Sequence, residues 1–353
     1  MIYAMYWLVS LSGAVFTSRS RQFGKLLAVA LALAGTILIV MRGAVGTDTV
    51  PVYESFATRL AANGLGSTVS TIEPGFQLLL AVLLRVTPSP TLAIRLVGVV
   101  YGLALLFYVL RSTRTELLFI LAIYLPAFLF PYGMNVLRIG LASVFILLST
   151  QYFSRRTRKL AILTALLAVS LHYSSSFIIA LLIVSTTQRL VSRRSIALAG
   201  LIIVGAAALV VWDPPYISTK LGLYTDYFSP TPLSGIRSLS LVLSTLVALL
   251  VSNLPRNLKV RLLLILGTTA GAAMLLSTYS YAGLRVLDLI AFSAPLALVL
   301  NHSRHRVRLN NPSLFLLIMA GVLFAAATFR GFILESATVG VLSPFLPYHT
   351  LAP

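Results

Sequence analysis

The chain lacks cysteine and has very little negative charge. Only 8 of its 353 residues are Asp or Glu, against 27 Lys or Arg, and charged residues together make up 10% of the sequence. The absence of cysteine excludes disulfides, zinc–thiolate sites and iron–sulfur clusters. A soluble domain carries about 25% charged residues, so a chain this poor in charge cannot cover a water-facing surface. The sequence is 58% hydrophobic, and we therefore expect a polytopic membrane protein.

Long apolar runs recur along the whole sequence. They predict an all-α bundle of about 12 transmembrane helices, folded as a single integral membrane domain over residues 1–353. The expected spans are Ile2–Phe16, Leu26–Val40, Leu92–Leu110, Glu116–Tyr132, Ile139–Phe153, Leu160–Leu171, Phe177–Leu190, Ile196–Trp212, Leu239–Val251, Leu258–Leu276, Val286–Leu300 and Ser313–Phe329. A further run, Phe76–Val86, is too short to cross comfortably and is followed by two prolines. It predicts a re-entrant or interfacial segment near 76–90.

The net charge of +19 raises the question of nucleic acid binding. The basic residues, however, fall in short clusters between apolar runs, as expected of cytoplasmic loops next to anionic lipid. We therefore expect the lipid bilayer, and no nucleic acid, as a partner. The clusters are Arg19-Arg21-Lys25, Arg111-Arg114, Arg155-Arg156-Arg158-Lys159, Arg189-Arg193-Arg194, Arg256-Lys259-Arg261 and Arg304-Arg306-Arg308. All of them lie on the cytoplasmic side only if the segment 76–86 does not cross the membrane.

The polar residues outside these clusters then share the outer face. They are Arg42, Asp48, Glu73, Asn135, Arg138, His172, the loop Asp213–Arg237, Arg285 and Asp288. The positive-inside rule does not explain arginines on the outer side, and lone charges at helix ends there are candidates for a functional site. We expect the outer loops 41–76 and 213–237 to cover this site.

The first outer loop offers two candidate groups. Arg42 and Asp48 lie on either side of Gly43 and Gly46, an arrangement in which backbone amides can approach a phosphate while the arginine meets its charge. The alternative is an anchor for lipid headgroups with a glycine that stops the helix. Glu73 precedes a short helix, where a carboxylate can be an N-terminal cap or a general base.

Arg138 is placed at the N-terminal end of a predicted helix, where the helix dipole disfavours a cation. An anionic partner is therefore expected, either a ligand or Asp48 or Glu73. His172 ends one span and precedes the next; it is either a capping or interfacial residue, or a base for a sugar hydroxyl. Arg285 and Asp288 lie three residues apart on one helical face, so they are either site residues or an intrahelical ion pair.

In their order and spacing, these residues resemble the EpsG family of bacterial polysaccharide polymerases, which is related in role to the Wzy O-antigen polymerases. The matching stretches are Arg42 with Gly46-Thr47-Asp48 and Tyr53, then Glu73-Pro74-Gly75-Phe76, Asn135 with Arg138, and His172-Tyr173-Ser174. Beyond residue 180 the likeness depends on hydropathy and the Arg285 region. The family commonly reads Asn-x-x-Arg-Gln, whereas Ile139 follows Arg138 here, so one polar partner of the substrate is missing or comes from elsewhere.

The resemblance implies polymerisation of polyprenyl-diphosphate-linked oligosaccharide repeats at the outer face of the bacterial plasma membrane. Lipid-linked donor and acceptor are then the partners, and a chain-length regulator is a further candidate. We expect Arg42, Arg138 and Arg285 to stabilise the leaving diphosphate, with Asn135 and Tyr173 as further substrate contacts. The candidate catalytic residues are His172, Glu73 and Asp48.

In this hypothesis His172 or Glu73 takes the proton of the acceptor hydroxyl, with preference for His172. No cofactor and no metal are expected, because arginines can supply the positive charge, although Asp48 with Glu73 could bind a metal ion. Two alternatives remain. One is a transferase that adds a single sugar from a polyprenyl-phosphate donor, usually with a divalent metal; the other is a flippase or transporter of lipid-linked oligosaccharides.

Overall fold

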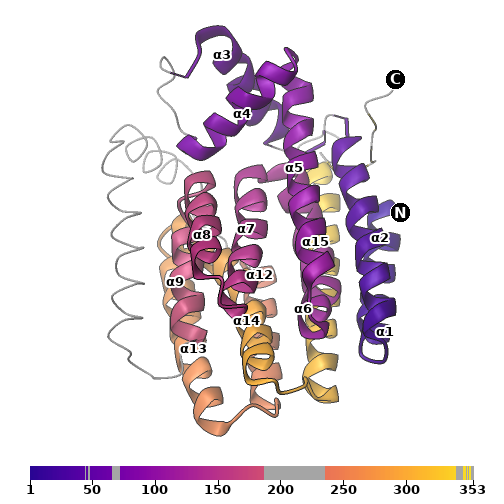
Figure 1. Cartoon of the computed structure of the whole chain (residues 1–353), viewed down its shortest axis with the longest axis vertical. Helices are drawn as coiled ribbons and strands as arrows, with labels where there is room; N and C mark the ends of the chain where they lie inside the picture. Colours follow the sequence, from indigo (N-terminus) through magenta and orange to yellow (C-terminus); the bar gives the residue numbers. More distant parts are fainter. Residues whose placement is uncertain are drawn as a thin grey trace. The chain divides into compact units, whose positions relative to one another are not determined.

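The computed structural model describes residues 1–43, 45–46, 48–65, 72–186, 235–338, 345–346, 348 and 350. The regular secondary structure of these residues is helical, and the chain forms two compact units (Figure 1). The first unit comprises Met1–Tyr173 and Ala325–Pro353, and the second comprises Ser174–Phe324. The predicted single domain over 1–353 stays a prediction. The expected span Ile196–Trp212 and most of the loop 213–237 lie outside the described residues.

Six helices within the described ranges are long and apolar enough to cross a membrane. They are α2 (Arg21–Val40), α5 (Pro90–Arg111), α7 (Leu137–Ser154), α13 (Arg256–Ser277), α14 (Tyr281–His305) and α15 (Asn311–Thr338). Shorter apolar helices are α1 (Ile2–Thr17), α4 (Pro74–Val86), α9 (Ser175–Thr186) and α12 (Ile236–Leu250). The chain is thus an all-helical, multi-pass membrane protein, whereas the predicted count of about 12 spans is not confirmed.

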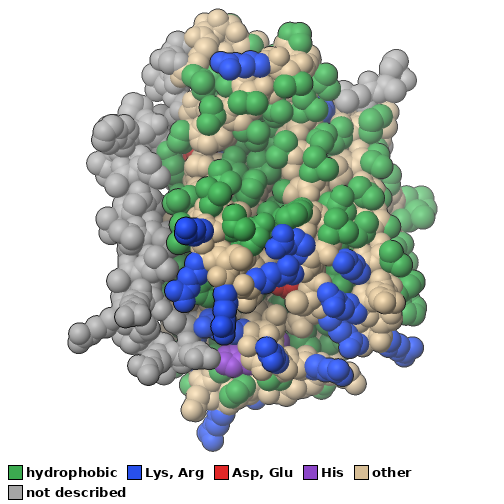
Figure 2. Space-filling model, viewed as in Figure 1, with side chains coloured by type: hydrophobic (Ala, Val, Ile, Leu, Met, Phe, Trp, Pro, Cys, Tyr) green, Lys and Arg blue, Asp and Glu red, His purple; other side chains and the backbone are tan. Residues whose placement is uncertain are grey.

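The surface of these helices is that of a protein in lipid. On the face drawn in Figure 2, hydrophobic side chains cover a broad area and most Lys and Arg side chains gather beside it. In helix α8 (Arg158–Leu171), Ile162, Leu163 and Leu166 are all exposed. A row of exposed aliphatic side chains is unfavourable in water and is expected where the neighbours are acyl chains.

The first unit has its basic residues at one end of its helices. Arg21, at the start of α2, donates a hydrogen bond to the carbonyl of Ser112 (3.2 Å), and Arg114 donates one to the carbonyl of Thr17 (3.0 Å). Arg155, just after the end of α7, donates to the carbonyl of Arg111. The basic clusters around residues 19–25, 111–114 and 155–159 are therefore neighbours.

The polar residues of the predicted site lie at the opposite helix ends. Arg42 follows the C-terminus of α2, Arg138 is in the first turn of α7, and His172 follows the C-terminus of α8. Helix α2, with its 20 residues, spans about 30 Å, which is the thickness of the hydrocarbon core of a bilayer. Within this unit, the site residues and the basic clusters are thus separated by one membrane thickness.

The expected span Glu116–Tyr132 is not one regular α-helix. Helix α6 (Arg114–Phe119) continues into the wide π-helical turns of η2 (Ile120–Phe128), and a second π-helical segment, η3 (Pro131–Asn135), precedes α7. Pro126 lies inside η2, and because it has no N–H, it cannot make the α-helical bond to residue i−4. Segments of this kind are frequent at functional sites.

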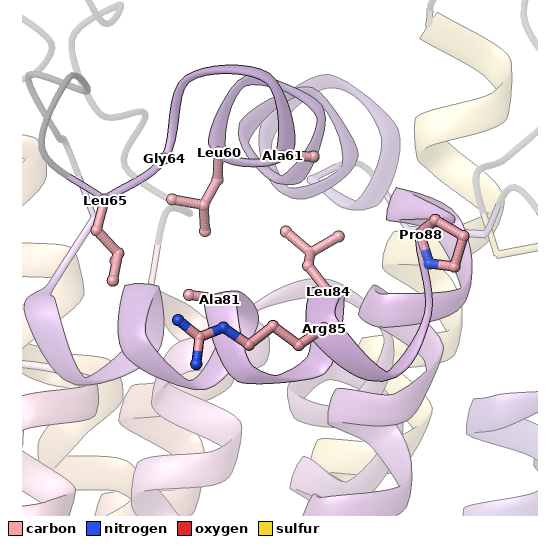
Figure 3. A pocket seen from close by; sticks show the side chains of 8 residues that line it. All are labelled: Leu60, Ala61, Gly64, Leu65, Ala81, Leu84, Arg85 and Pro88. Carbon is pink, nitrogen blue, oxygen red and sulfur yellow. The ribbon is translucent and has the colours of Figure 1, made fainter.

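Two short helices lie across one end of the first unit (Figure 1). After the π-helical turn η1 (Thr49–Glu54), α3 (Ser55–Asn63) packs on α4 and α5. A groove of about 360 Å³ lies between α3 and the C-terminal half of α4 (Figure 3). It is lined by Leu60, Ala61, Gly64, Leu65, Ala81, Leu84, Arg85 and Pro88. That α4 lies at the membrane interface stays a prediction.

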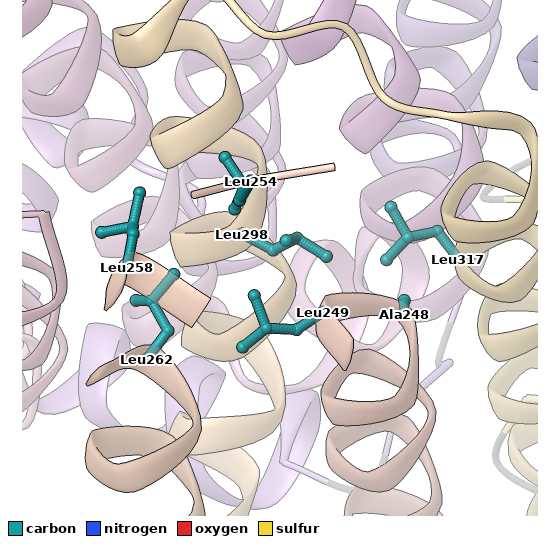
Figure 4. Close-up of a cluster of buried hydrophobic side chains, with 7 residues drawn as sticks. All are labelled: Ala248, Leu249, Leu254, Leu258, Leu262, Leu298 and Leu317. Atoms are coloured by element: carbon teal, nitrogen blue, oxygen red, sulfur yellow. The ribbon is translucent and has the colours of Figure 1, made fainter. Parts of the chain in front are cut away.

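In the second unit, α12, α13 and α14 pack on one another. Their aliphatic side chains form a buried cluster with the start of α15 (Figure 4), which comprises Ala248, Leu249, Leu254, Leu258, Leu262, Leu298 and Leu317. Arg261 of α13 donates to the carbonyl of Ser185 (2.7 Å) at the end of α9. This arginine therefore closes the C-terminus of a neighbouring helix, where unpaired carbonyls favour a cation.

Candidate active site

Glu73 is the centre of a polar cluster in the first unit. Its carboxylate is fully buried, with Oε2 2.5 Å from Arg138 Nη1 and Oε1 2.8 Å from His172 Nδ1. The side chain of Arg138 is 13% exposed and that of His172 is 23% exposed. Three residues that are distant in sequence, and all predicted as site residues, therefore meet at one point.

The surroundings of Glu73 differ from those of a helix cap, while its predicted role as a base stays a prediction. It occupies the N-cap position of α4, but its side chain makes no capping hydrogen bond to that helix. The carboxylate instead pairs with Arg138, which is one of the anionic partners expected for an arginine at the N-terminus of a helix. Glu73 is therefore part of the cluster and not a simple helix cap.

Gly75 permits the close approach of α4 and α8. A Cβ atom at this position would lie 2.4 Å from Ser170 Oγ and 2.7 Å from the Ser170 carbonyl carbon and oxygen. Backbone atoms cannot yield as a flexible side chain can. Only glycine therefore lets the start of α4 lie against the end of α8, and this contact brings Glu73 to His172.

The electrostatics of the cluster fix the protons on its members. Burial alone would raise the pKa of Glu73, but the neighbouring His172 and Arg138 outweigh it and hold that pKa well below its usual range. Glu73 is therefore ionised and can only accept hydrogen bonds. His172 must donate its Nδ1–H to Glu73, and in the neutral imidazole the lone pair is then on Nε2.

Two aromatic residues support this cluster. The guanidinium of Arg138 lies 6.0 Å from the ring centroid of Tyr53, and the Tyr53 ring packs on Phe76 at 5.6 Å between centroids. Burial raises the pKa of Tyr53, so its phenol stays neutral. Aromatic packing against a guanidinium favours one orientation of its plane.

Asn135 and Asp48 join the first outer loop to the segment that precedes Arg138. The backbone N–H of Asp48 donates to Asn135 Oδ1 at 2.7 Å, and the hydroxyl of Thr49 donates to the carbonyl of Met134 at 2.7 Å. Gly46 has a φ of +103°, and a Cβ there would lie 2.3 Å from the Met134 carbonyl oxygen. The side-chain carbonyl of Asn135 thus anchors this loop, while its predicted contact with substrate stays a prediction.

Arg42 belongs to a different cluster of the same unit. It is buried, and its Nη1 donates to the carbonyls of Ile39 (2.9 Å) and Gly133 (2.7 Å). Its charged neighbours are Arg95 and Glu54. Arg95 was not predicted as a site residue because it lies within the expected span Leu92–Leu110. A lone arginine inside an apolar run is itself a signal for a functional residue, and this signal could have found it.

Three further residues of the predicted site region have surroundings of their own. Tyr173 follows His172 and is buried. Arg285 belongs to the second unit, where its guanidinium lies 5.1 Å from the Tyr281 ring centroid, and Asp288 accepts a hydrogen bond from Ser238. Their predicted roles stay predictions. Within the described ranges, no three His, Asp or Glu side chains gather as metal ligands would.

Comparisons with known proteins show one match. No curated protein and no solved structure is similar to this chain. A family model, that of the EpsG family, matches residues 25–350, which is nearly the whole chain. EpsG is a family of Wzy-like polysaccharide polymerases. The match includes both the cluster around Glu73 and the helices of the second unit, and the chain therefore belongs to the EpsG family.

Proposed function

We propose that this protein polymerises polyprenyl-diphosphate-linked oligosaccharide repeat units at the outer face of the bacterial plasma membrane. The growing glycan leaves its lipid carrier and is transferred to a hydroxyl of the next lipid-linked unit. The observation that carries the proposal is the buried Glu73 carboxylate, which holds a histidine and an arginine together at helix ends opposite the basic clusters of the first unit. Basic clusters favour the cytoplasmic side, so the Glu73 cluster faces outward.

The chemistry follows from the proton positions. The acceptor hydroxyl attacks the anomeric carbon, the bond from that carbon to the diphosphate oxygen breaks, and a new glycosidic bond forms. His172 Nε2 takes the hydroxyl proton, while Glu73 holds the imidazole through Nδ1 and stabilises the imidazolium that results. Glu73 is a weak base because its pKa is lowered. We therefore propose His172 as the base and Glu73 as the residue that positions it.

Arg138 supplies the positive charge that stabilises the leaving diphosphate. A diphosphate leaves as an anion and needs no proton, so a fixed cation next to the base is what the reaction requires. Glu73 and Tyr53 orient the guanidinium. No divalent metal is needed in this scheme, and a loss of activity in EDTA that Mg²⁺ or Mn²⁺ restores would contradict that part.

The test is the product made by a His172→Gln variant. Purified protein in vesicles is given lipid-linked repeat units, and product length is read on a gel. We expect polymer formation to fall by about 10²–10⁴-fold, the usual contribution of a general base, with the protein still folded. His305→Gln is the matched control, since His305 lies in a basic cluster of the second unit and should not affect polymer.

Other products would overturn the proposal. A wild-type protein that adds one sugar and stops is a single-sugar transferase that uses a lipid-phosphate donor. A protein that moves lipid-linked oligosaccharide across the vesicle membrane without forming a bond is a transporter. Normal polymer from His172→Gln would remove the assignment of the base.

A Gly75→Ala variant tests whether the contact between α4 and α8 is needed. The new methyl group must displace the Ser170 backbone, which moves Glu73 away from His172 and reduces polymer by about 10²-fold. The control is Gly267→Ala in α13, where a Cβ meets no atom within 4 Å. Alanine is the better helix former there, so this control should be at least as stable as wild type. Full activity from Gly75→Ala would show that the contact does not position the cluster.

A further inference from the structure

Two buried arginines share one carboxylate near the junction of α2 and α5. Arg42 is 0% exposed and Arg95 is 2% exposed. The carboxylate of Glu54 lies 3.7 Å from Arg95 Nη2 and also accepts a hydrogen bond from the hydroxyl of Thr91 at 3.2 Å. This second cluster therefore has two guanidinium groups against one carboxylate.

Both arginines are held by backbone carbonyls. Arg42 uses Nη1 for the carbonyls of Ile39 and Gly133, and Arg95 uses Nη2 for the carbonyl of Gly43 at 2.7 Å. These bonds occupy one corner of each guanidinium and fix its orientation. The positions of both groups are therefore set by the protein before any ligand arrives.

The other nitrogens of these two side chains have no acceptor among the residues that the structure describes. They are Nε and Nη2 of Arg42 and Nε and Nη1 of Arg95. Buried charged donors without acceptors are strongly unfavourable. Burial, together with the charge of Arg95, lowers the pKa of Arg42 to about 9, so Arg42 is still a cation at neutral pH. The cluster is short of negative charge.

We propose that Arg42 and Arg95 form a second anion site, which binds a phosphate or diphosphate group. Guanidinium edges bind phosphate oxygens through paired N–H donors, and rigidly held edges do so at low entropic cost. Glu54 is 18% exposed, so the cluster meets the surface on that side. Glu54 also competes with the ligand for Arg95.

This site uses other arginines than the Glu73 cluster does. The π-helical turn η1 carries both Tyr53, which packs on Arg138, and Glu54, which pairs with Arg95. Consecutive residues of one turn thus contact different arginines. Polymerisation uses two lipid-linked substrates, and each carries a diphosphate. This assignment rests on the proposed function: each of the two anion sites would hold the diphosphate of one substrate.

The experiment measures how many diphosphate ions the full-length protein binds in detergent, by calorimetry with inorganic diphosphate as the probe. We expect two ions per wild-type chain. Arg95→Gln should lose one ion and keep the other, and Arg138→Gln should lose the ion that Arg95→Gln keeps. Arg111→Gln is the control in the same helix, since Arg111 packs on the rings of Phe107 and Tyr152 and should leave two ions bound.

Glu54→Gln tests the same site in the opposite direction. In the background of Arg138→Gln, removal of the competing carboxylate should tighten diphosphate binding about tenfold. If Arg95→Gln does not fold, this variant alone decides. Unchanged or weaker binding by Glu54→Gln, or two ions still bound by Arg95→Gln, overturns the second site. Neither readout involves polymer, so a failure of the proposed function would leave these results intact.

Discussion

Replacing Arg138 with lysine is expected to stop polymer synthesis while the protein stays folded. The guanidinium contacts Glu73 and lies over the Tyr53 ring, and its planar, delocalised charge suits both contacts. An ammonium is a compact, strongly hydrated charge that cannot reproduce this geometry. Loss of one preorganised electrostatic group at a reacting centre costs about 10²–10³-fold in rate. The measurement is the rate of polymer formation in vesicles at saturating lipid-linked substrate.

The matched control is Arg111→Lys. Arg111 also lies over aromatic rings, with its guanidinium 4.9 Å from the Phe107 centroid and 5.0 Å from that of Tyr152, but it belongs to the basic end of the first unit. We expect wild-type polymer from this variant. Equal polymer from Arg138→Lys and wild type would show that any cation suffices, and the argument from guanidinium geometry would fail.

Sequence patterns located most helix ends because charge and glycine or proline mark them. The expected spans Leu92–Leu110 and Ile139–Phe153 are α5 and α7 with ends shifted by one or two residues. The run Glu116–Tyr132 was predicted less well. Its apolar composition indicates a helix, but a composition pattern does not distinguish α-helical from π-helical turns, and the π-helical segment η2 here contains Pro126.

The polar residues of the site could be predicted individually but not as pairs. Helix-end logic identifies Arg138, and the structure adds that Glu73 is a partner of its guanidinium. The pairing depends on the contact of Gly75 with Ser170, residues far apart in sequence. Arg42 was expected at the same diphosphate as Arg138. Its charged neighbours in the structure are Arg95, which lies within an apolar run, and Glu54, while the predicted role of Arg42 at that diphosphate stays a prediction.

Replacing Glu73 with glutamine should reduce polymer formation. It should also remove a pH-dependent contribution to the stability of the folded protein. The glutamine amide can donate to His172 Nδ1, which forces the proton onto Nε2 and removes the base. We expect polymer to fall by about 10²–10⁴-fold. The variant also removes a charged partner of Arg138, and breaking a buried ion pair costs about 3 kcal/mol or more. Thermal unfolding in detergent measures this second effect.

The pH dependence separates the ion pair from simple packing. Because the pKa of Glu73 is lowered in the folded protein, its carboxylate stabilises the fold above the unfolded pKa of about 4.3. That contribution is lost as the pH falls below this value toward the folded pKa. The difference in melting temperature between wild type and Glu73→Gln should therefore be full at pH 7 and shrink below pH of about 4. A difference that stays constant with pH would indicate lost packing alone.

A double variant then shows whether Glu73 acts through His172. Residues that work as a unit give non-additive losses. If Glu73 only positions the imidazole of His172 and stabilises the imidazolium, the double variant Glu73→Gln, His172→Gln should be no less active than His172→Gln alone. A further loss of more than about tenfold in the double variant would mean that Glu73 also contributes through Arg138. In a protein that already carries His172→Gln and Arg138→Lys, adding Glu73→Gln should then cause no further loss, because both contacts of the Glu73 carboxylate are already changed.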